Sequence, residues 1–317
     1  MSFFALKTVA VLSMLFDHVY HLFHLELFDQ PLEAFGRWAA ESFPGPVGDA
    51  LSWFAGFLIL ALPYLGRIAA PIFLFCIANG YRHTRSVKRY AQRIFLFGAL
   101  AQIPYFLYLK AWEARLGEEL YIPLNFMFTL GLGLLSIALY EREKEQNPSL
   151  ALLAAFLPIA AAEFFRTEGG GMYAMLVPAF YLTMELPLQK RAVIWMLFFP
   201  VAQLGYWIWL FQGPITGPPL AETFLYAVGP CLGVAVALFY NGEKGHATKT
   251  AQYGVYALYP VHFLVLALLG FPQQVNNLLK VYQQKGGITC AGQPAVSNNL
   301  SPAGAGGDDR LPAGGAV

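Results

Sequence analysis

The chain has 317 residues, of which 57% are hydrophobic and only 12% carry a charged side chain. A soluble domain usually carries about 25% charged residues, so this chain has too few charges to cover the surface of a soluble fold of its size. The formal net charge is only +1, which leaves no basic excess for holding nucleic acid, and we expect no nucleic-acid partner. The composition therefore predicts an integral membrane protein.

Nine apolar stretches have about the length, 17–25 residues, that a helix needs to cross a bilayer core of roughly 30 Å. They are rich in Leu, Phe, Ala and Ile and show no alternation with period two, which favours helices over barrel strands. In chain order they lie at about residues 3–25, 67–82, 93–109, 122–140, 149–165, 171–187, 191–211, 220–240 and 251–271. The sequence thus predicts an all-α, polytopic transmembrane helix bundle of about nine to ten spans.

An additional apolar segment at residues 51–65 is short for a span, and the distribution of basic residues decides its placement. If this segment does not cross, and if the N-terminus is cytoplasmic, most Lys and Arg residues fall on one side of the membrane. That arrangement fits the positive-inside rule. We therefore expect residues 26–65 to form an outer loop whose second half is a re-entrant or interfacial segment, at about 51–65.

The composition changes near the end of the sequence to Gln, Asn, Gly, Ala and Pro. Such a segment cannot bury enough apolar surface to order itself. We predict a membrane-embedded domain at residues 1–272 and a disordered low-complexity tail at residues 273–317.

The first predicted helix carries the densest group of ionisable residues within a span, where each charge is costly and suggests function. Lys7 and His18 are 11 residues apart, close to three helical turns, so they share a face and lie about 16 Å apart along the axis. Asp17 points about 100° away from His18, which makes a dyad between them doubtful, and we expect Asp17 to pair with Arg67. The alternative for His18 is a structural histidine that is hydrogen-bonded to a neighbour.

No metal site is predicted. His18 and His21 would need further ligands that the sequence does not place, and His21 and His24 are more simply explained as interfacial residues. The three cysteines lie far apart, so they indicate neither a zinc site nor a disulfide framework.

A basic stretch follows the second predicted span. One interpretation is a topology signal, and the other is a binding site for an anionic phosphate ligand, since arginine matches phosphate with paired hydrogen bonds. The residues of this candidate site are Arg82, Arg85, Arg89 and Arg93.

Further candidates for a polar cavity lie in other spans. Asn125 and Thr129 are four residues apart and share a helix face, where hydrogen bonding between helices is the favoured role. Tyr259 and His262 flank a proline that frees a backbone carbonyl and can kink the last span toward the bundle interior. Arg67, at the outer end of the second span, completes this group of candidate cavity residues.

Four segments of this sequence resemble the TraX family. In the family's order, they are LKTVAVLSMLFDH (Leu6–His18), GRIAAPIFLFCIANGYRHTRSVKRYAQR (Gly66–Arg93), NFMFTLGLG (Asn125–Gly133) and YALYPVH (Tyr256–His262). The resemblance covers the whole predicted membrane domain, except for the insertion at about residues 26–60.

The resemblance implies an acetyltransferase, because TraX is known for N-terminal acetylation of the F-type conjugative pilin. The family is also similar to membrane acyltransferases that O-acetylate bacterial surface glycans. In those proteins the first helix carries a basic residue and a histidine with ten positions between them, and an R-x-x-R pattern follows the second helix. Lys7 and His18 match the first feature and Arg82 and Arg85 the second, although Arg89 competes for that alignment.

The resemblance thus implies an acyltransferase-like domain in the bacterial cytoplasmic (inner) membrane. Acetyl-CoA would be the acyl donor and would bind at the cytoplasmic arginines, and the acceptor would be an amine or hydroxyl of a pilin or of a surface glycan. The implied catalytic group is His18, with Asp17 and Lys7 beside it. His18 would act as a general base, or as a nucleophile that holds the acetyl group.

Two other classes of function remain open. The histidines could form the proton relay of a transporter, which predicts an internal repeat that we do not find. The chain could also be a noncatalytic membrane scaffold for pilus or envelope assembly, which would leave the spacing of Lys7 and His18 without a use.

Overall fold

The structure is a computed structural model that describes residues 1–211, 218–245 and 254–271, all within one unit, Met1–Gln274. The described residues form helices joined by short connections, and no β-strand occurs among them. The predicted all-α class is confirmed for this part of the chain. The predicted tail at residues 273–317 lies outside the described residues.

Four of the helices begin after a residue whose side chain caps the first turn. The side chains of Ser2, Ser86, Asn125 and Asn147 each accept a hydrogen bond from a backbone N–H of the first helical turn that follows. In chain order the helices are α1 (Phe3–His24), the π-helical turn η1 (Leu25–Asp29), α2 (Gln30–Ser42), α3 (Pro46–Gly66), α4 (Ala69–His83), α5 (Val87–Leu116), α6 (Phe126–Glu143), α7 (Pro148–Phe164), α8 (Gly170–Thr183), α9 (Leu188–Phe211), α10 (Pro218–Leu238) and a last described helix, Gly254–Phe271.

Four helical runs of the described chain are long and apolar enough to cross a membrane. They are Phe3–Ser42, Pro46–His83, Val87–Leu116 and Gly254–Phe271. Large apolar side chains are exposed along the helices, among them Leu12, Leu152 and Leu268, as is expected where lipid takes the place of water. The protein is therefore a helical membrane protein.

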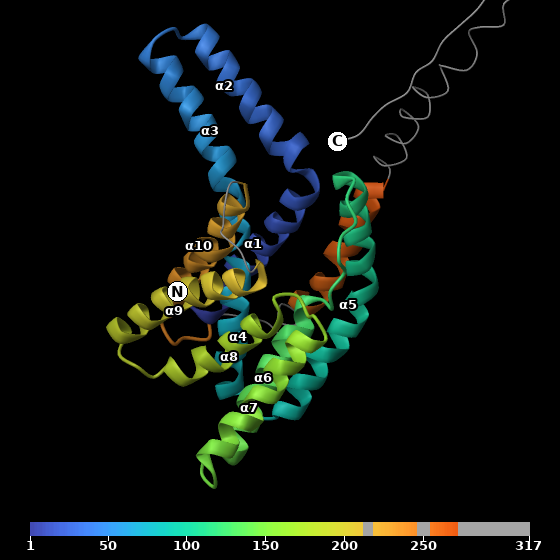
Figure 1. Ribbon diagram of the computed structural model, residues 1–317, viewed down its shortest axis with the longest axis vertical. Helices are drawn as coiled ribbons and strands as arrows, with labels where there is room; N and C mark the ends of the chain where they lie inside the picture. Colours follow the sequence, from blue (N-terminus) through green and yellow to red (C-terminus); the bar gives the residue numbers. More distant parts are fainter. Residues whose placement is uncertain (212–217, 246–253, 272–317) are drawn as a thin grey trace, which may run out of the picture. The chain divides into compact units, whose positions relative to one another are not determined.

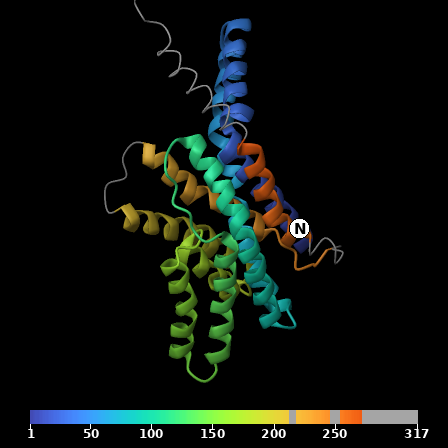
Figure 2. The same ribbon diagram turned by 90° about the vertical axis from the view of Figure 1, so that its right-hand side faces the viewer.

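The α2–α3 hairpin extends away from the other helices (Figures 1 and 2). We call it the arm, residues 30–66. η1 leads from α1 into α2, and α3 leads into α4 after a short turn, so the arm has no flexible linker at its base. Within the arm, Ser52 donates a hydrogen bond of 2.7 Å to the carbonyl oxygen of Gly36. The outer loop expected at residues 26–65 is thus built of helices, and the segment 51–65 is part of α3.

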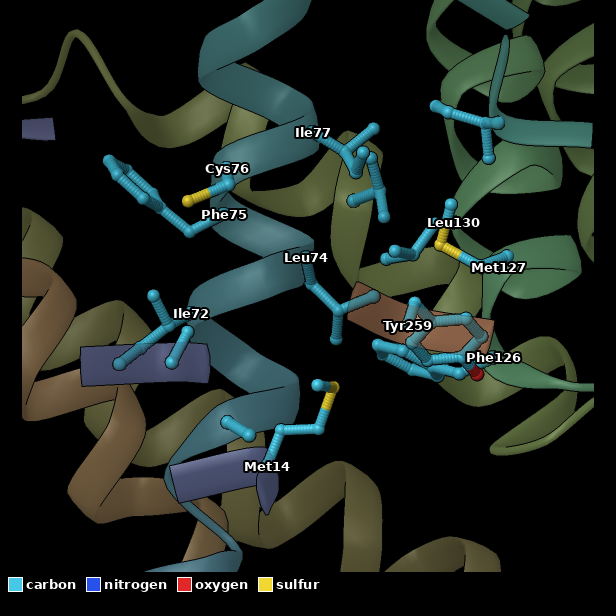
Figure 3. Close-up of a cluster of buried hydrophobic side chains, with 14 of the residues drawn as sticks. Met14, Ile72, Leu74, Phe75, Cys76, Ile77, Phe126, Met127, Leu130 and Tyr259 are labelled. Atoms are coloured by element: carbon cyan, nitrogen blue, oxygen red, sulfur yellow. The ribbon is translucent and has the colours of Figure 1, made fainter. Parts of the chain in front are cut away.

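α4 lies at the centre of the bundle, where it contacts α1, α6, α8 and α10. Its side chains Leu74 and Phe75 are almost fully buried (Figure 3). α10 approaches the start of α4 closely because Gly229 and Gly233 have no side chain, and a Cβ at Gly233 would overlap the carbonyl oxygen of Ile68. This close packing fixes the turn between α3 and α4, which carries a candidate site residue.

Candidate functional site

His18 of α1 and His262 of the last described helix form a pair, although 244 residues separate them in the chain. Nδ1 of His18 lies 3.0 Å from Nε2 of His262, and Nδ1 of His262 lies 3.0 Å from the carbonyl oxygen of Leu258. A carbonyl oxygen only accepts hydrogen bonds, so Nδ1 of His262 carries the hydrogen. In the neutral ring, Nε2 of His262 then accepts from the Nδ1–H of His18. Nε2 of His18 is therefore the nitrogen that is left to act as a base.

Aromatic side chains fix the ring of His18. The rings of Tyr108 and Phe263 pack against it, with centroids at 5.4 Å and 4.6 Å, and both side chains are almost fully buried. The hydroxyl of Tyr108 also donates a hydrogen bond of 3.2 Å to the carbonyl oxygen of His18. The orientation of the histidine within α1 is thus set by two neighbouring helices, α5 and the last described helix.

Arg67 links Asp17 to His21. Its Nη2 lies 3.3 Å from Oδ1 of Asp17 and 2.7 Å from Nε2 of His21. Since a guanidinium only donates, Nε2 of His21 accepts, and its Nδ1–H donates to the carbonyl oxygen of Asp17 at 2.7 Å. The predicted pair between Asp17 and Arg67 is present. Asp17 serves this network, and His21, which we expected at the interface, belongs to the network rather than to a lipid-facing surface.

This network requires that α1 and the end of α3 approach each other closely. Gly66 supplies the space, because a Cβ there would overlap the carboxylate of Asp17. The hydroxyl of Ser13 donates a hydrogen bond of 2.6 Å to the carbonyl oxygen of Leu65, where a helix end would otherwise leave an acceptor unsatisfied. The contact therefore requires small residues on both helices.

Glu168 is a site residue that sequence reasoning did not single out. It lies in the loop between α7 and α8, and its Oε2 accepts a hydrogen bond of 3.1 Å from the backbone N–H of Phe126. Phe126 is the first residue of α6, where the helix dipole favours a negative charge. Burial raises the pKa of the Glu168 carboxyl to about 7, although a hydrogen bond from Tyr105 acts in the opposite direction. A carboxylate in a short loop between two spans gave no signal in the sequence.

Two adjoining pockets lie beside α1. The first, which we call the lysine pocket, has a volume of about 460 Å³ and mostly apolar or aromatic walls. Lys7 and Lys244 both line it. They are neighbours because the backbone N–H of Phe4, one helical turn before Lys7, donates to the carbonyl oxygen of Lys244 at 3.2 Å. Lys244 lies in the segment after α10. The spacing within the first helix that singled out Lys7 gave no indication of Lys244.

The second, the histidine pocket, has a volume of about 80 Å³ and is lined by polar groups, among them Asp17, His18, Arg67 and Glu168. The two pockets adjoin, because four residues line both of them. Three of these, Met14, Phe126 and Tyr259, lie on the side of α4 that carries Leu74 (Figure 3). The shared residues are Met14, Phe73, Phe126 and Tyr259.

The four arginines of the candidate phosphate site are not gathered at either pocket. Arg82 pairs with Glu185 at 3.0 Å. Arg85 and Arg89 are exposed, and the guanidinium of Arg93 lies 5.9 Å from the ring of Tyr90, a residue of the lysine pocket wall. The basic stretch is also less of a loop than expected, since α5 already begins at Val87.

Asn125 and Thr129 make hydrogen bonds between elements. The side-chain amide of Asn125 donates to the carbonyl oxygen of Gly98 at 2.7 Å, and the hydroxyl of Thr129 lies 2.6 Å from the carbonyl oxygen of Glu168. Both side chains are fully buried. They hold α5, α6 and the α7–α8 loop together, and Thr129 thereby positions Glu168.

Within the described chain, no group of three or more His, Cys, Asp or Glu residues could hold a metal ion.

The fold and the site define a helical membrane protein with a polar centre enclosed between its helices. A family model described as TraX protein matches residues 2–270, and the chain belongs to the TraX family. A relative from Dichelobacter nodosus, described as a probable fimbrial assembly protein FimC of serogroup H1, is 26% identical over 268 residues. That alignment covers 84% of this chain and 94% of the relative. No solved structure matches the chain. The resemblance drawn from the four sequence segments is thus confirmed.

Proposed function

We propose that this protein is an acetyltransferase of the bacterial inner membrane, which moves an acetyl group from cytoplasmic acetyl-CoA to an amine or hydroxyl acceptor. One observation carries this proposal: the lysine pocket and the histidine pocket meet beside His18, whose Nε2 is left as a base. A donor and an acceptor that entered by different pockets would meet at that nitrogen. The TraX family and the fimbrial relative favour a pilin as the acceptor.

The lysine pocket suits acetyl-CoA as the donor. Lys7 and Lys244 are point charges that bind phosphate, and the apolar walls beyond them can take the narrow pantetheine arm. Lys7 and His18 are 11 residues apart on α1, which is about 16 Å along a helix axis. An extended arm would carry the thioester from the lysines toward His18.

The transfer step that we propose needs one base, once the acceptor is uncharged, and no covalent intermediate on the protein. The acceptor nitrogen or oxygen attacks the thioester carbonyl carbon while Nε2 of His18 takes its proton. The C–S bond then breaks, and the thiolate of CoA leaves with the proton that His18 holds. His262 keeps His18 in the required tautomer by accepting the hydrogen bond from its Nδ1–H.

We propose that the lysine end of α1 faces the cytoplasm and that the arm lies on the outer side. Nine helices would then cross the membrane: α1, α4 to α10, and the last described helix. This arrangement puts the N-terminus and the segment 239–245 on the same side. The backbone hydrogen bond of 2.8 Å from Phe3 to Glu243 supports that placement.

The proposal is tested with purified protein reconstituted in phospholipid vesicles and supplied with acetyl-CoA labelled in its acetyl group. We expect release of CoA and appearance of the label on a peptide with the sequence of a pilin N-terminus. No CoA release above that of empty vesicles would contradict the proposal. A transporter would instead move protons or a solute without consuming acetyl-CoA.

Replacing Lys7 and Lys244 together with Gln should weaken acetyl-CoA binding by about ten- to 100-fold, since a hydrogen bond to a charged group is worth about 1.5–3 kcal/mol. Isothermal titration of the protein in detergent with acetyl-CoA measures the change. The matched control is the double variant Arg85→Gln and Arg89→Gln, which removes two exposed cations from the cytoplasmic end. A larger loss in the arginine variant than in the lysine variant would move the phosphate site to the basic stretch.

A further inference from the structure

The histidine pocket contains a second group that can accept a proton. The carboxylate of Glu168 lines the same small pocket as His18 but comes from the α7–α8 loop. Other ionisable groups also influence Glu168 or line its pocket, from α1, the α3–α4 turn, α5, α8 and the last described helix. They are Asp17, His18, Arg67, Tyr105, Tyr108, Tyr173 and Tyr259.

Glu168 differs from Asp17, the other carboxylate of the pocket, in its partners. Asp17 is paired with Arg67 at 3.3 Å, so its charge is already compensated. The groups that Glu168 accepts hydrogen bonds from, the N–H of Phe126 and the hydroxyl of Tyr105, are neutral. Arg67 lines the same pocket and lowers the pKa of the Glu168 carboxyl through its charge, but the guanidinium is ion-paired with Asp17. Its charge is therefore the one that an incoming cation would meet.

Acetylation of an amine and acetylation of a hydroxyl differ in the number of protons that must leave. A terminal amine has a pKa of about 7.7–8.0, so at pH 7 it arrives mostly as an ammonium group without a free lone pair. It must lose one proton before it attacks the thioester and a second one as the amide forms. A hydroxyl acceptor loses only one proton. A site with two bases is thus suited to the amine.

We propose that Glu168 is a second catalytic base, which takes the first proton from an ammonium acceptor, while His18 takes the second. This inference rests on the proposed acetyltransferase function. In the first step an N–H bond of the ammonium group breaks and an O–H bond forms on Glu168. In the second step the C–N bond forms and the C–S bond breaks. The second proton then passes from the nitrogen through Nε2 of His18 to the thiolate, and Glu168 returns its proton to water.

The pKa of Glu168 suits this role. With a pKa of about 7, the carboxyl group is ionised in a large fraction of molecules at neutral pH and can also release the proton that it takes. Protonation below pH 7 removes the base, so the rate of amine acetylation should fall on the acid side of about pH 7.

The test compares two acceptor peptides with the same sequence, one with a free N-terminal amine and one that begins with the corresponding 2-hydroxy acid. In the Glu168→Gln variant, we expect amine acetylation to fall about tenfold at pH 7, because only about a tenth of the amine is neutral there. The loss should disappear by pH 9, where the amine is deprotonated in solution. Acetylation of the hydroxyl peptide should stay at the wild-type rate.

Equal losses with both peptides at every pH would overturn the proposal, since they would indicate a structural role for Glu168. An unchanged rate with the amine at pH 7 would overturn it as well. Failure of the acetyltransferase function itself is distinct, because the wild-type protein would then acetylate neither peptide.

If Glu168→Gln does not fold, the variant Tyr105→Phe tests the role of Glu168 instead. Loss of the Tyr105 hydrogen bond should raise the pKa of Glu168 and move the acid limb of amine acetylation to higher pH, and an unmoved limb would contradict the proposal.

Discussion

The rate of acetyl transfer should fall by about 10²- to 10⁴-fold when His18 is replaced by Ala, because a positioned general base contributes a factor of that size. The loss should appear in the rate at saturating acetyl-CoA, since His18 does not line the lysine pocket, where we propose that the donor binds. Release of CoA by the reconstituted protein, with labelled peptide as acceptor, measures the rate.

The matched control for His18→Ala is His83→Ala, which removes an exposed histidine at the end of α4. This variant should keep the wild-type rate. Both variants should insert into vesicles and bind acetyl-CoA as the wild-type protein does. A His18→Ala protein that is folded and still transfers acetyl groups at more than a tenth of the wild-type rate would rule out His18 as the base.

Arg67→Met should lower the free energy of unfolding by about 3–5 kcal/mol, because the buried carboxylate of Asp17 loses its cation. Both side chains of the pair are more than four-fifths buried, with 17% and 18% of the side-chain surface exposed. Methionine keeps an apolar stem against α10, so the change removes the charge and the hydrogen bond to His21 but keeps the packing of the stem. Unfolding by a denaturing detergent in mixed micelles measures the difference.

The exposed pair between Arg37 and Glu33 provides a comparison for Arg67→Met. Its side chains are 68% and 56% exposed, and Arg37→Met should change the stability by less than about 1 kcal/mol. Adding Asp17→Asn to Arg67→Met should restore part of the loss, since position 17 then carries no charge that has lost its cation. A single Arg67→Met variant that is as stable as the wild-type protein would show that water compensates Asp17.

Spacing along one helix made part of the site predictable. The 11-residue separation placed Lys7 and His18 on one face of α1. The direction of Asp17 around that helix argued against a dyad with His18, and Arg67 was then the expected partner. Both inferences need only the geometry of a regular helix and one ionisable partner at the start of the next predicted span.

Contacts between distant helices were not predictable in the same way. His262 was a candidate for the cavity, but nothing in the sequence gives its position beside His18, which depends on the packing of the last described helix against α1 and α5. Glu168 and Lys244 lie in connecting segments, where hydrophobic periodicity carries no information. The sequence did not predict the arm, because α2 is too polar to be recognised as a membrane span. α2 nevertheless forms a helix that packs against α3.

The shared wall of the two pockets also concerns the electrical tightness of the membrane. A continuous water path from Lys7 to the histidine pocket would conduct protons and dissipate the membrane potential. The residues that line both pockets, Met14, Phe73, Phe126 and Tyr259, have largely apolar side chains. A passage lined by apolar side chains repels water and ions, as hydrophobic gates do in channels. In the proposed function, the same side chains that bring donor and acceptor together would also insulate the two sides of the bilayer from each other electrically.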